Sequence, residues 1–146
     1  MSYFFVTSSV VTLVKWMVLH GLKPGVYRMN TIFAWRKWLS DKLMEMSLRM
    51  NYSLYSTLYT VPFLRLLGAK IGKWSEVSTV QHIEPDLLTL GDGVFIADMA
   101  SIGAATFHRD CLALQPSVVG DRTFVGNSAV VRCNTVMYVC TVCVLW

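Results

Sequence analysis

The hydrophobic pattern between residues 71 and 136 repeats every six residues. An aliphatic residue opens each of nine hexapeptides, at Ile71, Val77, Ile83, Leu90, Ile96, Ile102, Val119, Val125 and Val131. The second position is small in six hexapeptides, five times as glycine, where average composition predicts about one glycine. The fifth position is Ser, Thr, Ala or Val in seven. This combination is typical of a parallel β-helix built from hexapeptides.

Each position of the hexapeptide has an expected role in such a coil. The aliphatic residue fills the interior, the fifth residue must be small where the wall turns inward, and glycine relieves backbone strain at the corner. Three hexapeptides make one coil, so residues 71–136 are expected to form about three coils, which is the minimum for a stable stack. The pattern breaks between His108 and Val118, where a loop would leave the coil. An atypical apolar tail follows at residues 137–146.

The chain begins with an apolar segment. Tyr3 to Leu19 carries only hydroxyl groups and Lys15 as polar side chains, and a full membrane span needs about 20 apolar residues. We therefore expect residues 1–22 to form a partial or short transmembrane helix, with Lys15 extending its amine toward the membrane surface. A buried amphipathic helix is the alternative.

Residues 23–70 are expected to be an amphipathic, interfacial helical region. Helical spacing from Thr31 to Met50 puts tryptophans on one face, and charged residues, including Lys37, on the other. Such a helix can lie on a bilayer, or it can pack on the repeats. The segment from Tyr52 to Leu67 is rich in Tyr and Leu and is broken by Pro62.

Charge divides the chain into two halves. Residues 1–70 carry nine Lys or Arg and two acids, whereas residues 71–146 carry four and seven, which gives +7 and −3 and sums to the net charge of +4. Because the basic residues are interleaved with Trp, Tyr and apolar runs, the expected partner is a membrane and not nucleic acid. The basic residues that follow the apolar segment place the repeats on the cytoplasmic side of that membrane.

Several longer motifs are more specific than the hexapeptides. They are K-P-G, R-L-L-G-A-K-I-G, P-D-L-L-T-L-G-D-G and G-D-R-T-F-V-G-N-S-A. Together, from about Lys15 to Thr135, the chain resembles the membrane-associated C-terminal region of Pls/PosA-type nonribosomal peptide synthetase-like proteins, which are similar to polylysine synthetases. The resemblance implies a left-handed, three-sided β-helix of the hexapeptide transferase superfamily. It also implies a fragment of a larger protein, without that protein's adenylation and carrier domains.

Two histidines of the repeat region are candidate catalytic residues. Hexapeptide acyltransferases commonly use a histidine as general base to deprotonate an acceptor amine or hydroxyl. His108 stands at the start of the interruption and His82 at a corner of the second hexapeptide; His20 is a weaker candidate. Ordinary surface histidines are the alternative. Since a zinc site of the carbonic anhydrase type needs three histidines, we expect no metal site.

Other polar residues are expected to be structural. Asp92 and Asp121 fall at G-D-G and G-D-R corners, where aspartate normally bonds local backbone, and Asp98 and Asp86 follow the same interpretation. The four cysteines, Cys111, Cys133, Cys140 and Cys143, are expected to be buried free thiols. The sequence contains no glycine-rich phosphate loop and no recognisable Cys/His nucleophile pattern.

These observations predict an acyl- or aminoacyl-transferase-like module of a membrane-bound peptide synthetase-like protein. The donor would be acyl-coenzyme A or a carrier-linked phosphopantetheine thioester, with no tightly bound cofactor. Expected partners are the membrane, a carrier domain of the same larger polypeptide, and two further copies in a homotrimer. The alternatives are a non-catalytic membrane-anchored scaffold and a stand-alone O-acetyltransferase of the hexapeptide family.

Overall fold

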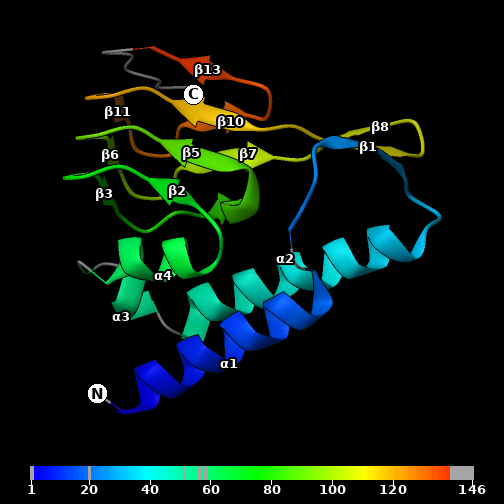
Figure 1. The fold of residues 1–146 in the computed structure, drawn as a ribbon, viewed down its shortest axis with the longest axis horizontal. Helices are drawn as coiled ribbons and strands as arrows, with labels where there is room; N and C mark the ends of the chain where they lie inside the picture. Colours follow the sequence, from blue (N-terminus) through cyan, green and yellow to red (C-terminus); the bar gives the residue numbers. More distant parts are fainter. Residues whose placement is uncertain (1, 20, 51, 56, 58, 139–146) are drawn as a thin grey trace.

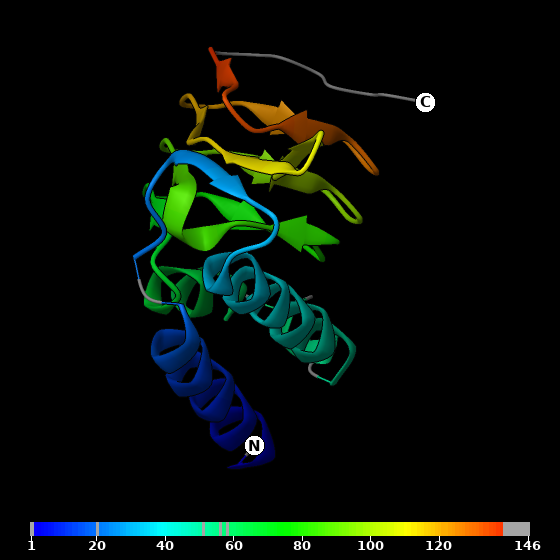
Figure 2. The same cartoon turned by 90° about the vertical axis from the view of Figure 1, so that its right-hand side faces the viewer.

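A computed structural model describes residues 2–19, 21–50, 52–55, 57 and 59–138. The N-terminal half is helical apart from one strand, and the C-terminal half consists of short strands (Figure 1). The elements of the N-terminal half are α1 (Ser2–Val18), β1 (Gly25–Arg28), α2 (Ile32–Met50), α3 (Tyr52–Tyr55) and α4 (Thr60–Leu66). Helices α1 and α2 lie side by side below the piled strands of the C-terminal half, on the side of the earliest of these strands, as Figures 1 and 2 both show.

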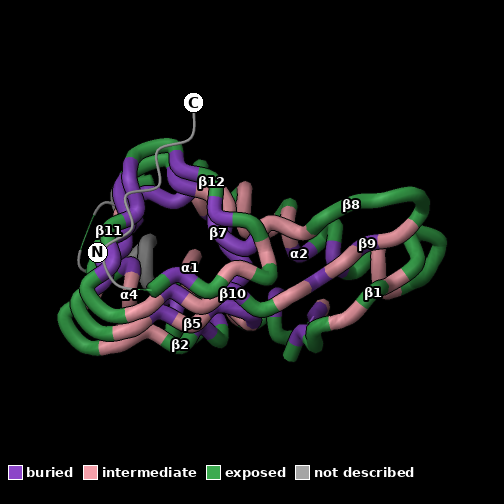
Figure 3. Tube along the Cα trace, turned by 90° about the horizontal axis from the view of Figure 1, so that it is seen from above, coloured by how far each residue is buried: buried purple, intermediate pink, exposed green. Residues whose placement is uncertain are grey.

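The C-terminal half contains three sheets of parallel strands around one interior, here called the strand stack (residues 70–104 and 117–137; Figure 3). Its strands are β2 (Lys70–Ile71), β3 (Glu76–Val77), β4 (His82–Ile83), β5 (Leu88–Leu90), β6 (Phe95–Ile96), β7 (Ser101–Ala104), β10 (Ser117–Val119), β11 (Phe124–Val125), β12 (Val130–Arg132) and β13 (Val136–Met137). A single 3-10 turn, η1 (Pro85–Leu87), precedes β5.

Successive strands of the stack join the three sheets in turn. The sheets have the orders β13-β10-β5-β2, β11-β6-β3 and β12-β7-β4, and every pairing in them is parallel. Seen from above, the sheets lie around a shared interior (Figure 3). The left-handed β-helix implied by the resemblance stays a prediction.

The predicted interior positions of the hexapeptides are buried. Eight of the nine first-position aliphatic residues are buried, and Ile71 is half-buried at the end of the stack. Four of the seven small fifth positions are also enclosed: Ala100 and Ala129 are fully buried, and Val94 and Thr123 are 1 % exposed. Ser75 and Thr135 are half-buried, and Thr106 is exposed where the chain leaves the stack. The first position of the hexapeptide is therefore aliphatic because burial of apolar surface is favourable. The fifth position is small because little interior space remains for its side chain.

The role predicted for the second-position glycines is wrong for four of the five. Among them only Gly103 adopts positive φ; the left-handed residues stand mainly at the fourth position, namely Trp74, Gly93, Met99, Arg122, Ser128 and Asn134. A Cβ at Gly91 would instead lie 2.2 Å from Oδ1 of Asp121 and 2.7 Å from its backbone nitrogen. Glycine is required at Gly72 and Gly91 because the next coil approaches too closely for a side chain.

Gly91→Ala is expected to lower the free energy of unfolding by about 1–3 kcal/mol, the usual cost of overpacking, because backbone and side chain of Asp121 must both shift. Gly25→Ala is the matched control, since the nearest atoms to its Cβ lie at 3.5 Å. Urea unfolding followed by circular dichroism measures both changes. Equal stabilities of the two variants would show that close approach of the coils is not the constraint.

The interruption of the repeat forms a hairpin outside the stack. Strands β8 (Thr106–His108) and β9 (Cys111–Leu114) pair with each other, and β9 also pairs with β1 from the N-terminal half, both antiparallel. This three-stranded sheet projects away from the stack (Figure 3). The predicted limits, His108 to Val118, are therefore shifted: the chain has already left the stack at Thr106, and Ser117 is back in β10.

The residues after Val136 continue the stack for one more strand. Val136 and Met137 pair with Val118 and Val119 of β10, and Met137 is 5 % exposed. Met137 thus occupies the next first position of the repeat, although the sequence assigned it to an atypical tail. The rest of that predicted tail, residues 139–146, lies outside the described residues, together with Cys140 and Cys143.

Helix α1 differs from its predicted role in one respect. Lys15 is 2 % exposed and does not extend toward solvent, because its amine bonds groups of the strand stack. The exposed side of α1 is apolar and includes Val10, Leu13, Trp16 and Met17. Over the part of the chain that the structure describes, none of the helices combines the length and hydropathy required to cross a bilayer.

Helix α2 buries several polar side chains against the protein and exposes several large apolar ones to solvent. Lys37, Ser40 and Ser47 are buried, whereas Ile32 is 80 % exposed and Trp35 is 69 % exposed. The sequence placed Lys37 on the charged face opposite the tryptophans, and in the structure Lys37 faces the strand stack, which agrees with the alternative that this helix packs on the repeats. The exposed side of α2 carries Trp35 and Trp38 together with charged side chains such as Lys42.

Candidate functional site

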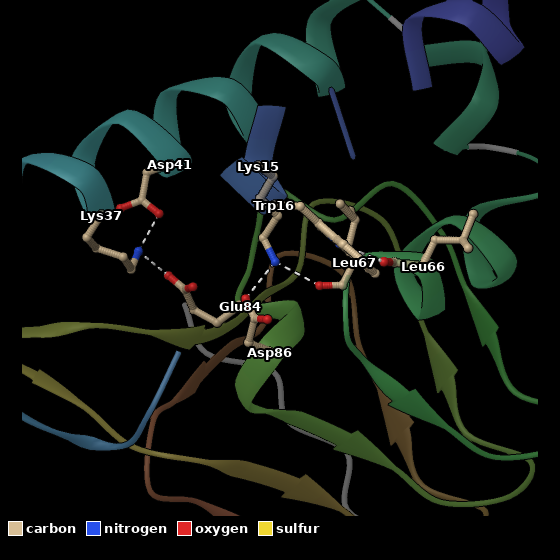
Figure 4. Close-up of polar contacts among 8 residues, drawn as sticks. All are labelled: Lys15, Trp16, Lys37, Asp41, Leu66, Leu67, Glu84 and Asp86. Carbon is tan, nitrogen blue, oxygen red and sulfur yellow. Dashed lines mark hydrogen bonds and ion pairs between the residues drawn. The ribbon is translucent and has the colours of Figure 1, made fainter. Parts of the chain in front are cut away.

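Two acidic residues lie between the strand stack and the helices, on the segment that follows β4. Glu84 precedes the turn η1 and Asp86 lies within it, with Pro85 between them at the first position of the turn. Proline restrains the residue before it to extended backbone, and Glu84 has φ −105° and ψ 89°. The two carboxylates consequently extend toward two different helices (Figure 4).

Asp86 holds α1. Its Oδ2 lies 2.6 Å from Nζ of Lys15, and the same amine donates to the backbone carbonyl of Leu67 at 2.7 Å. The side chains of Lys15 and Asp86 are 2 % and 10 % exposed. Nearby, Nε1 of Trp16 donates to the carbonyl of Leu66 at 3.3 Å. A buried lysine amine requires such partners, because an unpaired buried charge is strongly unfavourable.

Glu84 holds α2. Nζ of Lys37 forms ion pairs with Oε1 of Glu84 and with Oδ1 of Asp41, one helical turn further on in α2. The side chains of Lys37 and Glu84 are 3 % and 5 % exposed. One ammonium group thus serves two carboxylates, and the trio carries a net charge of −1 when all three are ionised.

The pKa values of Lys37 and Asp41 are raised, whereas the pKa of Glu84 is lowered. Burial would lower the pKa of Lys37, but the charges of Glu84 and Asp41 outweigh it and raise that pKa. Burial would raise the pKa of Glu84, but its bond with His82 and the charge of Lys37 hold that pKa below its usual range. Burial and the neighbouring charge of Glu84 raise the pKa of Asp41. Glu84 is therefore the carboxylate that stays ionised most readily.

His82 joins this cluster from β4. Its Nε2 lies 3.3 Å from Oε1 of Glu84, and its side chain is 33 % exposed. The neighbouring Ile83 points into the stack, so alternation along the strand directs His82 outward to α2. A buried carboxylate against one ring nitrogen orients the imidazole, and a general base requires such a fixed orientation toward its substrate.

The exposed part of His82 faces a cavity of about 540 Å³ between α2 and the strands. Volumes of several hundred Å³ suit small-molecule ligands. Apolar side chains and polar groups line it together; the polar ones are Asp41, Glu45, Arg49, Gln81, His82 and Ser101. On the rim, Glu45 is paired with Lys42 and with Arg49 at 2.7 and 2.6 Å.

The structure separates the two candidate histidines. His108 is exposed at the end of β8, and it is absent from the cavity that His82 lines. His20 lies outside the described residues. Of the two leading candidates, only His82 is combined with a buried carboxylate.

The aspartates of the repeat are structural, but their partners are not local. Oδ1 of Asp121 accepts from the backbone N–H of Asp92 at 2.8 Å, and Oδ1 of Asp92 accepts from that of Lys73 at 2.6 Å. Each carboxylate therefore bonds the preceding coil. Asp98 likewise bonds Ser78 and the backbone of Thr79, and these hydrogen bonds hold the pKa of Asp98 below its usual range.

Sequence reasoning missed Lys37, Asp41 and Glu84. Helical spacing assigns Lys37 and Asp41 to a charged face, and nothing in the local sequence distinguishes a face that packs on a buried acid from one in water. The available signal was Glu84-Pro85-Asp86, two acids held extended around a proline inside an apolar stretch. Among the described residues, no group of three His, Cys, Asp or Glu side chains has the arrangement of a metal site.

Comparison with known proteins places the chain beside a class of peptide-forming enzymes. It is 34 % identical over 132 residues to a protein named Delta-poly-L-ornithine synthetase from Acinetobacter baumannii (strain AB307-0294). The match covers 90 % of this chain and 10 % of that protein. No protein-family model matches the chain, and no solved structure matches it. The similarity supports a relationship with peptide synthetases of the Pls type.

Proposed function

We propose that the chain is an acyl- or aminoacyl-transferase-like module of a membrane-bound peptide synthetase-like protein, built on a left-handed β-helix of the hexapeptide transferase type. The observation that carries the proposal is His82, which combines a buried carboxylate partner with access to a cavity. The similarity to a poly-ornithine synthetase supports the peptide synthetase context.

In the proposed reaction, His82 acts as the general base. Because Nε2 faces Glu84, Nδ1 is the nitrogen that takes the proton from an acceptor amine or hydroxyl in the cavity. The acceptor then attacks the carbonyl carbon of a thioester donor, acyl-coenzyme A or a carrier-linked phosphopantetheine. Glu84 keeps the ring in this orientation, and the imidazolium returns the proton to the departing thiolate. The carrier domain belongs, in this proposal, to the same larger polypeptide.

The membrane partner is proposed from the outward faces of α1 and α2. Both faces expose several large apolar side chains, including Met17 on α1 and Trp35 on α2. Aromatic and aliphatic side chains on one face of a helix bind the interface of a bilayer. The strand stack would then lie on the cytoplasmic side, as the basic N-terminal half suggests, and assembly as a homotrimer would place three such modules together.

A non-catalytic scaffold is the second candidate function. It is favoured by the buried pairs of Lys15 with Asp86 and of Lys37 with Glu84, which fix both helices on the strand stack as a rigid anchor requires.

His82→Asn is expected to slow transfer at least about 100-fold, the usual contribution of a general base. The assay measures thiol release from acetyl-coenzyme A and from the ornithinyl thioester of pantetheine, with L-ornithine as acceptor. Lys73→Ala is the matched control, because that side chain is exposed and remote from the cavity. Transfer that is indifferent to His82→Asn in a folded protein removes the histidine mechanism and favours the scaffold.

A further inference from the structure

A second cluster of reactive groups lies on the projecting sheet formed by β1, β9 and β8. Cys111 of β9 is the direct cross-strand partner of His108 on one side and of Arg28 on the other. Directly opposite residues of antiparallel strands point to the same face of a sheet, with Cβ atoms about 4.5–5.5 Å apart. A thiol is thus flanked by an imidazole and a guanidinium.

This face of the sheet is open to solvent. Alternation places Leu112 and Tyr27 on the other face, where they pack in a small apolar cluster with Leu114. On the face of Cys111, His108 and Arg28 are exposed, and Cys111 is half-buried and free. The opposed pattern of burial along β9 shows that the thiol is turned away from the core.

The two-residue connection keeps the thiol and the imidazole together. Only Arg109 and Asp110 separate His108 from Cys111, and the carbonyl of Asp110 accepts the backbone N–H of Met29 at 2.8 Å. Strand β1 therefore restrains the turn end of the hairpin, where His108 and Cys111 are paired. Folding of the N-terminal half onto the hairpin also supplies Arg28.

We propose that Cys111 is an acyl-accepting nucleophile, with His108 as its base and Arg28 as the cation on its other side, placed to bind a donor that carries negative charge. His108 takes the proton of the thiol, Sγ attacks the carbonyl of a thioester donor, and the C–S bond of the donor breaks. The donor's thiol leaves with the proton from His108, and the acyl group remains on Cys111 as a new thioester. One thioester is exchanged for another, so no oxidant or reductant is needed.

This site would hold an acyl or aminoacyl group covalently on the module. It rests on the proposed function only for the class of donor, a thioester, and it uses none of the residues around His82. His108 is a candidate base from the sequence, but its partners are not predictable there, because His108-Arg109-Asp110-Cys111 matches no nucleophile motif and Arg28 lies far away along the chain. The hairpin itself was expected to be functional because it interrupts the repeat.

The test is incubation of the full chain with the ornithinyl thioester of pantetheine, followed by intact mass and peptide mapping. We expect one adduct, on Cys111, that hydroxylamine removes. Cys111→Ser abolishes it, His108→Asn slows its formation at least about tenfold, and Arg28→Gln also slows it. Cys133→Ser is the matched control and leaves it unchanged, since Cys133 is the other free cysteine of the described chain.

Labelling spread over the cysteines, or unaffected by His108→Asn, would overturn the proposal, and so would the absence of an adduct in a folded protein. The folded state of each variant is checked by circular dichroism, because serine in place of cysteine changes little in volume. His82→Asn separates the two proposals: it should slow transfer to L-ornithine at least about 100-fold and leave the adduct on Cys111 intact. Loss of only one signal therefore identifies which proposal fails.

Discussion

Asp86→Ala is expected to lower the free energy of unfolding by about 3–5 kcal/mol, the usual result of removing one partner of a buried ion pair. The amine of Lys15 would keep only the carbonyl of Leu67, at 2.7 Å, and its charge would remain buried without a counterion. Urea unfolding at neutral pH measures the change, and α1 is the element expected to detach first.

The control is a double-mutant cycle. Lys15→Met combined with Asp86→Ala removes the buried charge along with its partner, so the double variant should be more stable than the sum of the two single changes predicts. Additive effects would mean that the two side chains do not act as a pair in the folded protein. The double variant tests the ion pair itself, because any cavity left by Asp86 is present in both Asp86 variants.

Lys37→Met is expected to have a similar effect, about 3–5 kcal/mol at neutral pH, because Glu84 and Asp41 would face each other without the cation between them. This effect depends on pH. In the wild type the pKa of Glu84 is lowered, so its contribution to stability is present above the ordinary range of a glutamate and is lost as pH falls through the folded value.

The variant loses one of the two groups that hold this pKa down. Without Lys37, only His82 opposes the effect of burial, so the pKa of Glu84 should be higher in the variant than in the wild type. Protonation of Glu84 on acidification then removes the unpaired buried charge and lessens the destabilisation. The stability difference between wild type and variant should therefore shrink on acidification, which urea unfolding at pH 7 and pH 4.5 measures. The pKa of Asp41 is raised by burial and by the charge of Glu84, so protonation of Asp41 on acidification also lessens the repulsion between the two carboxylates.

Lys42→Met is the matched control for this change. Lys42 lies on the same helix and pairs with Glu45, but both side chains are largely exposed, and such pairs contribute about 0–1 kcal/mol. A difference for Lys37→Met that stays constant from pH 7 to pH 4.5 would show that the buried carboxylates are not responsible for it.

Much of the strand stack was predictable because its physical rule is local. Each first-position aliphatic residue points inward whatever the neighbouring coil contains, so the period alone identifies Ile96 and Ile102 as core. The reason for glycine was not predictable in the same way. Whether Gly91 serves a left-handed corner or a close approach depends on Asp121, a residue of the next coil, and the sequence does not contain the spacing between coils.

The candidate site was predictable only in part for a related reason. His82 could be selected because it precedes the inward-facing Ile83, although it lies in strand β4 and not at the predicted corner. Its partner Glu84 and the cation Lys37 come together only when α2 packs on the strands, and an amphipathic pattern does not state which face is inside. On sequence alone, Lys15 is expected to extend toward the membrane surface and Lys37 to lie on the charged face of its helix, because lysine is rarely buried without a partner. Their partners, Asp86 and Glu84, are distant along the chain.

The segment Glu84-Pro85-Asp86 also has a consequence for the order of folding. Strands of the stack bond partners 19 to 29 residues away, whereas Lys15 must find Asp86 across 71 residues. Since long chain closures carry a larger entropic cost, the first coils are expected to assemble before the helices dock. The helices then dock on strands that have already formed, and the ion pairs with Asp86 and Glu84 fix the docked positions of α1 and α2.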